Sequence, residues 1–308
     1  MKKVLFVGDI NVDVMMGGLR SLPVTDKEVM CESFDVVMGS SAVICAAAYA
    51  SLGGNASFLG LAGNDDYGNF MLNGMNALGI ATDRVRRTSE FRTGVTINMI
   101  FKSTRTQVTY PGTITEFDGR DIDAKTLQGF DHIHFAGPYQ QTRLRPEITR
   151  LLKLAAAQKS TTSLDPQWDA TEKWEYMDEW LPLLTYLFVN EGEATSLARK
   201  KSLEDACAAL QAKTHRAVVK AGSEGAMLLV DGSIYKIPAR PIDVIDTTGA
   251  GDCFDAGFLY GILEQNLDPR DALEIGSATG SRSCMYPGGV AHRSTYADIV
   301  KFIANELP

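Results

Sequence analysis

The sequence has no long apolar run, no excess of basic residues and no regular spacing of cysteines. Of its 308 residues, 38 are Asp or Glu and 30 are Lys or Arg, so the net charge is −8. This charge excludes attraction to nucleic acid or an anionic membrane through an overall positive field. No stretch approaches the roughly 18 apolar residues that span a bilayer. The five scattered cysteines form neither a disulfide nor a zinc framework, so we expect reduced thiols in a cytoplasmic protein.

The sequence also lacks internal repeats, low-complexity tracts and two common nucleotide-binding motifs. No GxxxxGK[ST] loop is present, and in GAGDCF, residues 249–254, Phe254 stands where a dinucleotide fingerprint needs its third glycine. That segment also comes late in the chain instead of after a first strand. These absences argue against a nicotinamide oxidoreductase, and no change in composition divides the chain into domains.

What the sequence does contain is an alternation of short apolar runs with amphipathic or Ala-rich segments. The alternation predicts an α/β fold with a mostly parallel sheet. The expected strands are residues 3–9, 56–63, 130–137, 161–165, 185–190 and 215–222. The expected helices are residues 40–52, 66–78, 145–158, 191–199, 202–213, 251–265, 270–284 and 295–306.

Two regions, residues 14–37 and 94–110, interrupt this alternation. Both are rich in β-branched residues and turn signals, and neither has a helical segment inside it. We expect them to form a small second sheet, a flap over the main one, within a single domain of residues 1–308.

The segment DTTGAGDCFDAGFLYG, residues 246–261, carries the clearest chemical signal. The small residues Gly249, Ala250 and Gly251 precede a run whose apolar residues recur at helical spacing. Backbone N–H groups at such a helix start can hold a phosphate or a developing oxyanion. Asp252 beside them could take the proton from a hydroxyl group that attacks phosphorus, which is a kinase arrangement. The alternative is that Asp252 is an N-cap and the glycines form only a turn.

These residues resemble the C-terminal signature of the ribokinase-like, or PfkB, carbohydrate kinase family. The resemblance extends through VGDINVD (7–13), residues 38–54 and 60–80, NEGE (190–193) and VVKAGSEGAML (218–228), so it covers residues 4 to about 290. It implies a three-layer α/β/α fold with a mostly parallel central sheet plus a small β-sheet lid. It also implies ATP-dependent phosphorylation of a primary hydroxyl of a small sugar or sugar derivative, with Mg²⁺ and K⁺ as candidate ions.

The resemblance also implies roles for individual residues. Asp252 would be the catalytic base, and Gly249, Ala250 and Gly251 would form the anion hole. On the nucleotide side, Asn190 and Glu193 would organise Mg²⁺–ATP through water, next to Lys220, Gly222 and Gly225. Asn11, Asp13, Gly39 and Ser40 would bind the acceptor, and Asp246 and Thr248 match a monovalent-cation site.

Two further acceptor contacts are expected from position alone. Asp165 follows the end of a predicted strand, and Asn98 belongs to the expected lid; a simple turn and surface exposure are the respective alternatives. Asn190 and Glu193 could equally be a helix-capping pair. His132 and His134 alternate along a strand without a third ligand, so we expect core histidines instead of a metal site. Asp255 is interpreted as an ordinary helix position.

The identity of the acceptor is left open by departures from the family pattern. Met38 replaces the first Gly of its N-terminal signature, and Val43 stands where an Asn contacts the sugar. A nucleoside kinase is therefore the alternative within the same chemistry, and a non-catalytic sugar- or nucleotide-sensing protein is the alternative outside it. The family often pairs its lids, so a homodimer through the lid is expected, with a small-molecule sugar or nucleoside as substrate and no nucleic acid or membrane partner.

Overall fold

The computed structural model of the chain describes residues 1–101, 104–290 and 293–305, and its α/β architecture confirms the predicted fold class. In spatial order, the strands of the central sheet are β14 (Ser233–Ile237), β13 (Ala226–Val230), β12 (Arg216–Lys220), β11 (Tyr186–Asn190), β10 (Thr161–Asp165), β9 (His132–Ala136), β1 (Lys3–Val7) and β4 (Asn55–Leu59). The strands from β4 to β12 are parallel, and β13 and β14 are added antiparallel at one edge.

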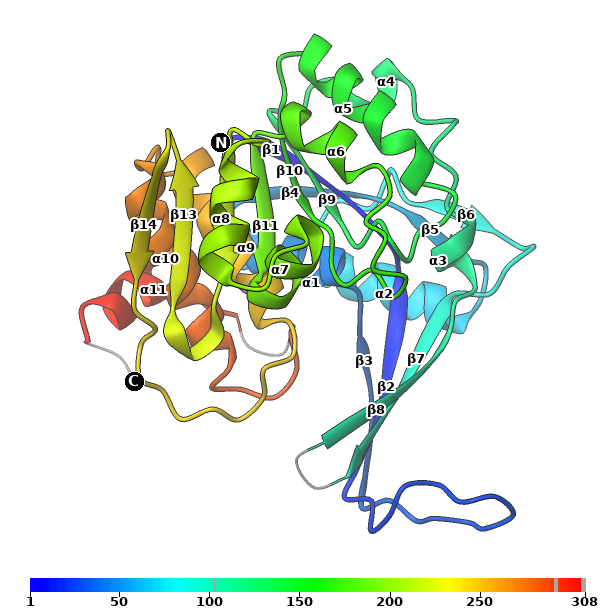
Figure 1. Ribbon diagram of the computed structural model, residues 1–308. Helices are drawn as coiled ribbons and strands as arrows, with labels where there is room; N and C mark the ends of the chain where they lie inside the picture. Colours follow the sequence, from blue (N-terminus) through cyan, green and yellow to red (C-terminus); the bar gives the residue numbers. More distant parts are fainter. Residues whose placement is uncertain (102–103, 291–292, 306–308) are drawn as a thin grey trace.

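Helices cover both faces of this sheet (Figure 1). One face carries α1 (Ser41–Ser51), α2 (Asp66–Ala77), α9 (Ala250–Leu263), α10 (Pro269–Ser283) and α11 (Tyr296–Ile303). The other carries α4 (Ala124–Leu127), α5 (Ile148–Ala157), α6 (Met177–Trp180), α7 (Glu191–Ala198) and α8 (Leu203–Gln211). The short helix α3 (Thr113–Glu116) follows the second sheet.

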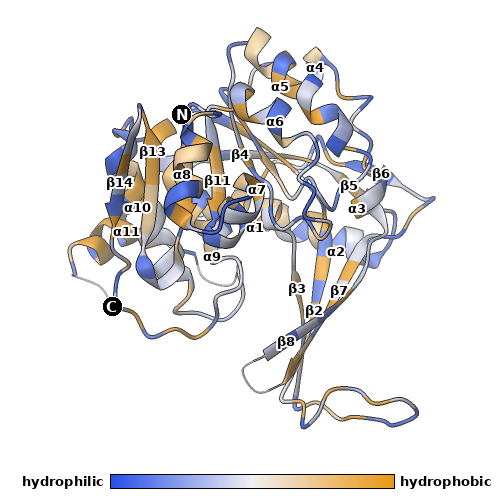
Figure 2. Cartoon of the chain, in the orientation of Figure 1, coloured by the Kyte–Doolittle hydropathy of each residue, from blue (hydrophilic) through white to orange (hydrophobic). Residues whose placement is uncertain are grey.

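The strand sequences explain why both faces are covered. In β1, Val4 and Phe6 belong to one buried cluster, while Leu5 and Val7 belong to the other. Consecutive side chains of a strand point to opposite faces, so an uninterrupted apolar strand needs a partner layer on each side. Figure 2 shows hydrophobic residues concentrated along the central strands and on the helix faces that meet them. The result is a three-layer core with its sheet in the middle.

A separate four-stranded sheet is found where the sequence predicted a flap. Its order is β3 (Ser33–Met38), β2 (Asn11–Gly17), β7 (Gly94–Phe101) and β8 (Thr104–Tyr110), and it projects away from the body (Figure 1). Only three residues separate β1 from β2, so the end of a central strand leads directly into this sheet. The first residues of β2 therefore lie at the junction between the two sheets.

Three details differ from the predicted elements. The expected strand at 56–63 is divided into β4 and β5 (Leu61–Gly63), which pairs with β6 (Arg86–Thr88) in a two-stranded sheet. Gly60 lies between them, where a Cβ atom would be 2.6 Å from the carbonyl oxygen of Gly8. Strands β13 and β14 were not predicted. The last helix ends at Ile303, and residue 306 of the expected helix lies outside the described residues.

No helix in the described part of the chain combines the length and apolar character needed to cross a bilayer.

Candidate active site

The bare turn predicted at residues 249–251 forms the start of α9. Gly249 is the N-cap with φ +74°, and no side chain caps the first turn. A Cβ atom on Gly249 would lie 2.8 Å from Ile44 and 3.1 Å from Gly289. Both the positive φ and the close packing therefore require glycine here. The backbone N–H of Ala250 donates to the carbonyl of Thr247 at 3.2 Å, so the N–H groups of Gly251 and Asp252, with the positive end of the helix dipole, are the ones that suit an anion.

Asp252 lies in the first turn of α9 with only 7 % of its surface exposed. The side-chain amide of Gln167 donates a hydrogen bond of 3.2 Å to its Oδ1. Burial, followed by the charge of Asp165, raises the pKa of Asp252 well above its ordinary value, although Lys220 and a hydrogen bond from Ser41 act in the opposite direction. A helix start would weaken this carboxylate as a base, but burial outweighs that effect.

The two expected acceptor residues of β2 contact each other at the junction of the sheets. The Asn11 amide donates to Asp13 at 3.1 Å and to Thr96 at 3.4 Å. A Cβ atom on Gly39 would lie within 2.8 Å of both Asn11 and Asp13, so Gly39 packs directly on this pair. The hydroxyl of Ser40 points instead to the backbone oxygen of Asp9 at 2.8 Å and to its Oδ1 at 3.2 Å.

Asp9 is a member of this group that the sequence reasoning missed. It follows the end of β1 inside the VGDINVD segment, and strand ends are the usual place for ligand contacts, which was the available signal. Burial, with a smaller contribution from Asp13, raises its pKa to about 6. Burial likewise raises the pKa of Asp13, and Asp9 in turn raises that of Asp252. Three carboxyl groups thus influence one another in a setting rich in hydrogen-bond acceptors.

A cavity of about 590 Å³ opens at the start of α9. Small and apolar residues dominate its lining, which matches the size and character of ligand pockets. The three predicted nucleotide residues Lys220, Gly222 and Gly225 all line it, as do Ala250 and Gly251 of the anion hole. Residues that were predicted from two distant segments of the sequence therefore line one cavity in the fold.

Asn190 and Glu193 form a reciprocal capping box at the start of α7. The backbone N–H of each donates to the side chain of the other at 2.8 Å. Burial, followed by the charge of Asp165, raises the pKa of Glu193 to about 7. The capping interpretation is thus confirmed, and the Mg²⁺ and phosphate role of the same pair stays a prediction.

Lys220 joins two buried carboxyl groups beneath the start of α9. Its ammonium lies 2.6 Å from Asp165 Oδ2 and 3.1 Å and 3.2 Å from the two oxygens of Asp255. Asp165 also accepts the backbone N–H of Gln167 at 2.9 Å, and its contact with the acceptor stays a prediction. The interpretation of Asp255 as an ordinary helix position is wrong, because its surface is fully buried.

Asn98 is buried, which excludes the alternative of surface exposure. Its side-chain oxygen accepts from Gln107 at 2.9 Å, and it also hydrogen-bonds Asp13. Asn98 therefore supports the acceptor pair from the neighbouring strand β7. A direct contact between Asn98 and the acceptor stays a prediction.

Asp246 and Thr248 belong to a loop that closes on the second sheet. The carboxylate of Asp246 accepts the backbone N–H groups of Thr248 and Gly288, each at 2.9 Å. The guanidinium of Arg105, on β8, donates to the hydroxyl of Thr248 at 3.2 Å. Despite burial, the pKa of Asp246 is lowered by its hydrogen bonds to Gly288 and Thr248 with a smaller contribution from Arg105, and the charge of Arg105 also opposes the effect of burial on the pKa of Asp13. Sequence reasoning missed Arg105, since no local pattern marks an arginine on an exposed strand.

The two alternating histidines are core residues, as expected. His132 bonds to Thr161 and Ser163, and His134 bonds to Ser163, each at 2.8 Å. Burial lowers the pKa of His132 to about 3 and that of His134 to about 4, so both rings are neutral at neutral pH. Among the described residues, no group of three or more His, Cys, Asp and Glu side chains is arranged to hold a metal ion.

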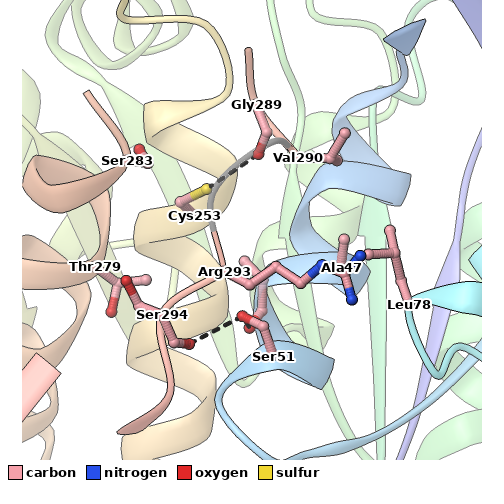
Figure 3. A pocket seen from close by; sticks show the side chains of 11 residues that line it. Ala47, Ser51, Leu78, Cys253, Thr279, Ser283, Gly289, Val290, Arg293 and Ser294 are labelled. Carbon is pink, nitrogen blue, oxygen red and sulfur yellow. Dashed lines mark hydrogen bonds between the residues drawn. The ribbon is translucent and has the colours of Figure 1, made fainter. Parts of the chain in front are cut away.

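A second, much smaller cavity lies among α1, α9, α10 and the segment that precedes α11. Its volume is about 20 Å³, which has room for about one water molecule. Figure 3 shows Cys253 directed at the carbonyl of Gly289 and Ser51 directed at that of Ser294, at 3.8 Å and 3.1 Å. The first contact joins the segment before α11 to α9, and the second joins it to α1.

Comparisons with known proteins agree with this geometry. Residues 1–295 match the family described as pfkB family carbohydrate kinase. The chain is 29 % identical to the ATP-dependent ribose-1-phosphate kinase of Halopiger xanaduensis, with 99 % of each chain covered, and 25 % identical to Bacillus subtilis ribokinase, with 97 % and 100 % covered. It superposes on a ribokinase II candidate from E. coli, solved with ATP and Mg²⁺, with a TM-score of 0.88 at 20 % identity, covering 99 % and 100 %.

The chain belongs to the pfkB family of carbohydrate kinases, and both the family and the enzyme class predicted from the sequence are confirmed. At this level of description it is a sugar or nucleoside kinase of the ribokinase family.

Proposed function

We propose that this protein transfers the terminal phosphoryl group of ATP to a primary hydroxyl of a small sugar or sugar derivative. The observation that carries the proposal is the position of Asp252. It lies in the first turn of α9, next to the nucleotide-sized cavity that Ala250 and Gly251 line, and its charge interacts with that of Asp9 near the acceptor pair.

Deprotonation of the acceptor hydroxyl is assigned to Asp252. A carboxylate with a raised pKa is a stronger base than a free aspartate, and the Gln167 amide fixes its orientation. The turn at Gly249 supplies fixed backbone dipoles for the charge that develops on the transferred group. Because Asp252 and the anion site belong to the same helix turn, the backbone of that turn fixes the position of one relative to the other.

The residues around the cavity fit ATP and Mg²⁺. The capping box uses only Oε2 of Glu193, so this carboxylate retains acceptor capacity for metal-bound water, which is how proteins commonly hold Mg²⁺ beside phosphates. When bound, ATP supplies the phosphoryl group and Mg²⁺ neutralises the charge of its phosphates. The E. coli relative solved with both ligands supports this assignment.

The second sheet acts as a lid in this proposal, and Arg105 links it to the phosphoryl-transfer centre. The guanidinium bridges from β8 to Thr248, one residue before Gly249. A cation at that point would face the transferred group when the lid closes, and closure would exclude water from the reaction. We assign Arg105 to stabilising the transferred phosphoryl group.

The acceptor residues favour a neutral, hydroxyl-rich molecule. Asp9, Asn11 and Asp13 offer oxygens to donor groups, and three neighbouring carboxyl groups disfavour an anionic acceptor. The Halopiger relative is named for ribose 1-phosphate, so a sugar phosphate belongs in the test panel. A nucleoside remains the second candidate because buried Val43 replaces the usual sugar-binding amide.

Three further assignments belong to this proposal. Asp246 and Thr248 are assigned to a K⁺ site, which replacement of K⁺ by Na⁺ in the assay tests. The lid is assigned to a homodimer interface, since Phe34, Ile97 and Val108 expose apolar surface on one face of it. Light scattering tests the dimer. The cytoplasm is the proposed location, because the five cysteines are all free.

The decisive experiment measures ADP release with MgATP and a panel of neutral sugars, sugar phosphates and nucleosides. Asp252→Asn is the matched control, since it keeps the shape of the side chain and should lower kcat by about 10³-fold. Turnover of no panel member would remove the kinase assignment for this chain. Near-full activity of the Asn variant would remove Asp252 from the role of base.

A further inference from the structure

Three ionisable side chains from different elements meet at the start of α9. Lys220 comes from the end of β12, Asp165 from the end of β10 and Asp255 from the second turn of α9. Both carboxyl groups have side chains only 1 % exposed, and the Lys220 side chain is 12 % exposed. Burying ionisable groups costs desolvation free energy, so a cluster of this kind next to the reaction centre suggests a role in the reaction.

The ammonium of this cluster lies directly against the anion hole. A Cβ atom on Gly251 would be 3.2 Å from Lys220 Nζ, so the ammonium occupies the space beside the first helix turn that a side chain would fill. Lys220 also lines the nucleotide cavity together with Gly251. Asp255 follows Asp252 by three residues, which places both side chains on the same side of α9. The cluster therefore contacts the nucleotide cavity and influences the base.

Burial constrains how the protons are shared in the cluster. The ammonium holds the pKa of Asp165 below its ordinary value despite the desolvation of that carboxyl group, whereas burial raises the pKa of Asp255 well above its own. These directions fit a cluster of one ammonium, one carboxylate and one carboxylic acid, which would leave no net buried charge. In this state Asp255 accepts a hydrogen bond from Lys220 and donates one to Asp165.

We infer that Asp255 is a positioning residue for phosphoryl transfer: it clamps the Lys220 ammonium beneath the first turn of α9, where that charge acts on the transferred group and on Asp252. The inference rests on the proposed kinase function. Asp255 itself touches no substrate in this scheme, and its entire effect passes through Lys220. The competing explanation is an ion cluster that only stabilises the fold.

The test compares three variants with the wild-type enzyme. Asp255→Leu removes both hydrogen bonds and should lower kcat at least about tenfold while the acceptor KM stays within about twofold. Asp255→Asn can accept from Lys220 and donate to Asp165, so it should stay within about threefold of wild-type kcat. Lys220→Met should weaken binding of ADP, measured by calorimetry, by about tenfold.

Two readouts separate positioning from a purely structural role. Because Asp255 acts through Lys220, adding Asp255→Leu to Lys220→Met should cause no further loss of kcat. The acid limb of kcat/KM should also move to higher pH in Asp255→Leu, since a displaced ammonium no longer lowers the pKa of Asp252. The other groups that face Asp252 are Asp9, Ser41, Cys45, Asp165, Gln167 and Cys253; the variant replaces none of them, and among them only Asp165 loses a hydrogen bond.

Thr279→Val on the neighbouring helix α10 is the matched control for loss of a buried polar group, and it should lower only the melting temperature. The inference is overturned if Asp255→Leu lowers the melting temperature but leaves kcat and the acid limb unchanged, if the two losses add, or if neither Asp255 variant folds. Absence of kinase activity in the wild-type protein would instead remove the proposed function, and the inference with it.

Discussion

The phosphoryl-transfer end and the acceptor end of the active site are built in different ways. Asp252, Asp165 and Asp255 lie in the body, at most 7 % exposed, on elements packed between two buried clusters. The acceptor end uses the lid sheet, in which every residue of β8 is exposed. The core therefore holds the reacting groups in place, whereas the groups that choose the acceptor depend on a sheet with little packing behind it. Such a division lets the acceptor change without disturbing the chemistry.

The largest difference that we expect between the body and the lid is the effect of a substitution on the free energy of unfolding. Phe258 is fully buried, with ring centroids 5.1 Å from Tyr186 and 5.5 Å from Phe188, so Phe258→Ala should lower the free energy of unfolding by at least about 3 kcal/mol. Phe34 in the lid is 62 % exposed in the single chain, and at concentrations at which light scattering shows a monomer Phe34→Ala should change the free energy of unfolding by less than about 0.5 kcal/mol. Urea unfolding measures both. Equal losses would mean that the lid is packed in solution and the comparison fails.

The next largest effect concerns the acceptor. Asp13→Asn removes a charged acceptor of hydrogen bonds and should raise the acceptor KM about 30-fold, with the ATP KM unchanged. Glu28→Gln, in the exposed loop between β2 and β3, is the control and should change neither constant. Steady-state kinetics with both substrates varied gives the result. A rise in both KM values for Asp13→Asn would show that the acceptor end and the phosphoryl-transfer end of the site do not act independently.

Arg105 tests the point where the two regions meet. Arg105→Ala removes the bridge from β8 to Thr248 and should lower kcat about tenfold, because one cation near the transferred group is lost. Arg20→Ala, an exposed cation in the same sheet's loop, should leave kcat unchanged. If the two variants behave alike in single-turnover assays, Arg105 has no part in the reaction and the lid acts only on the acceptor.

The smallest effect concerns pH. Because the pKa of Asp9 is raised to about 6, this group is a neutral acid below that pH and a carboxylate above it. A carboxylate accepts hydrogen bonds from hydroxyl groups more strongly, so acceptor affinity should rise about fivefold as the pH increases through 6. Asp9→Asn should flatten that dependence. An unchanged profile in the variant would assign the titration to another group, such as Asp13.

Residues that are close together in sequence could be assigned before the structure was known. Gly249, Ala250, Gly251 and Asp252 are consecutive, and a turn followed by a helix start fixes their arrangement through backbone geometry alone. The alternation of strands and helices similarly revealed the layered fold. Lys220, Gly222 and Gly225 were identified only through the family resemblance, because nothing local to a strand end indicates a nucleotide cavity.

Residues that act through distant partners were misjudged for a physical reason. Asp255 pairs with Lys220 and Asp165, which lie 35 and 90 positions earlier, so its burial depends on how α9 packs on the sheet. Arg105 carries no pattern of its own, and the strand-end position of Asp9 did not reveal its contact with Ser40. Apolar periodicity predicts which face of an element is buried, but not which polar groups meet there.

The sequence by itself indicated the alternation of most strands and helices, the turn at the start of α9 and the candidate base, because backbone hydrogen bonding and side-chain periodicity act over a few residues. Only the tertiary structure decided which charges meet beneath α9 and which polar groups surround Asp13. Those contacts join β1, β10, β12 and β8 to α9, and their energies depend on burial, which no single segment of the chain possesses before the layers pack together.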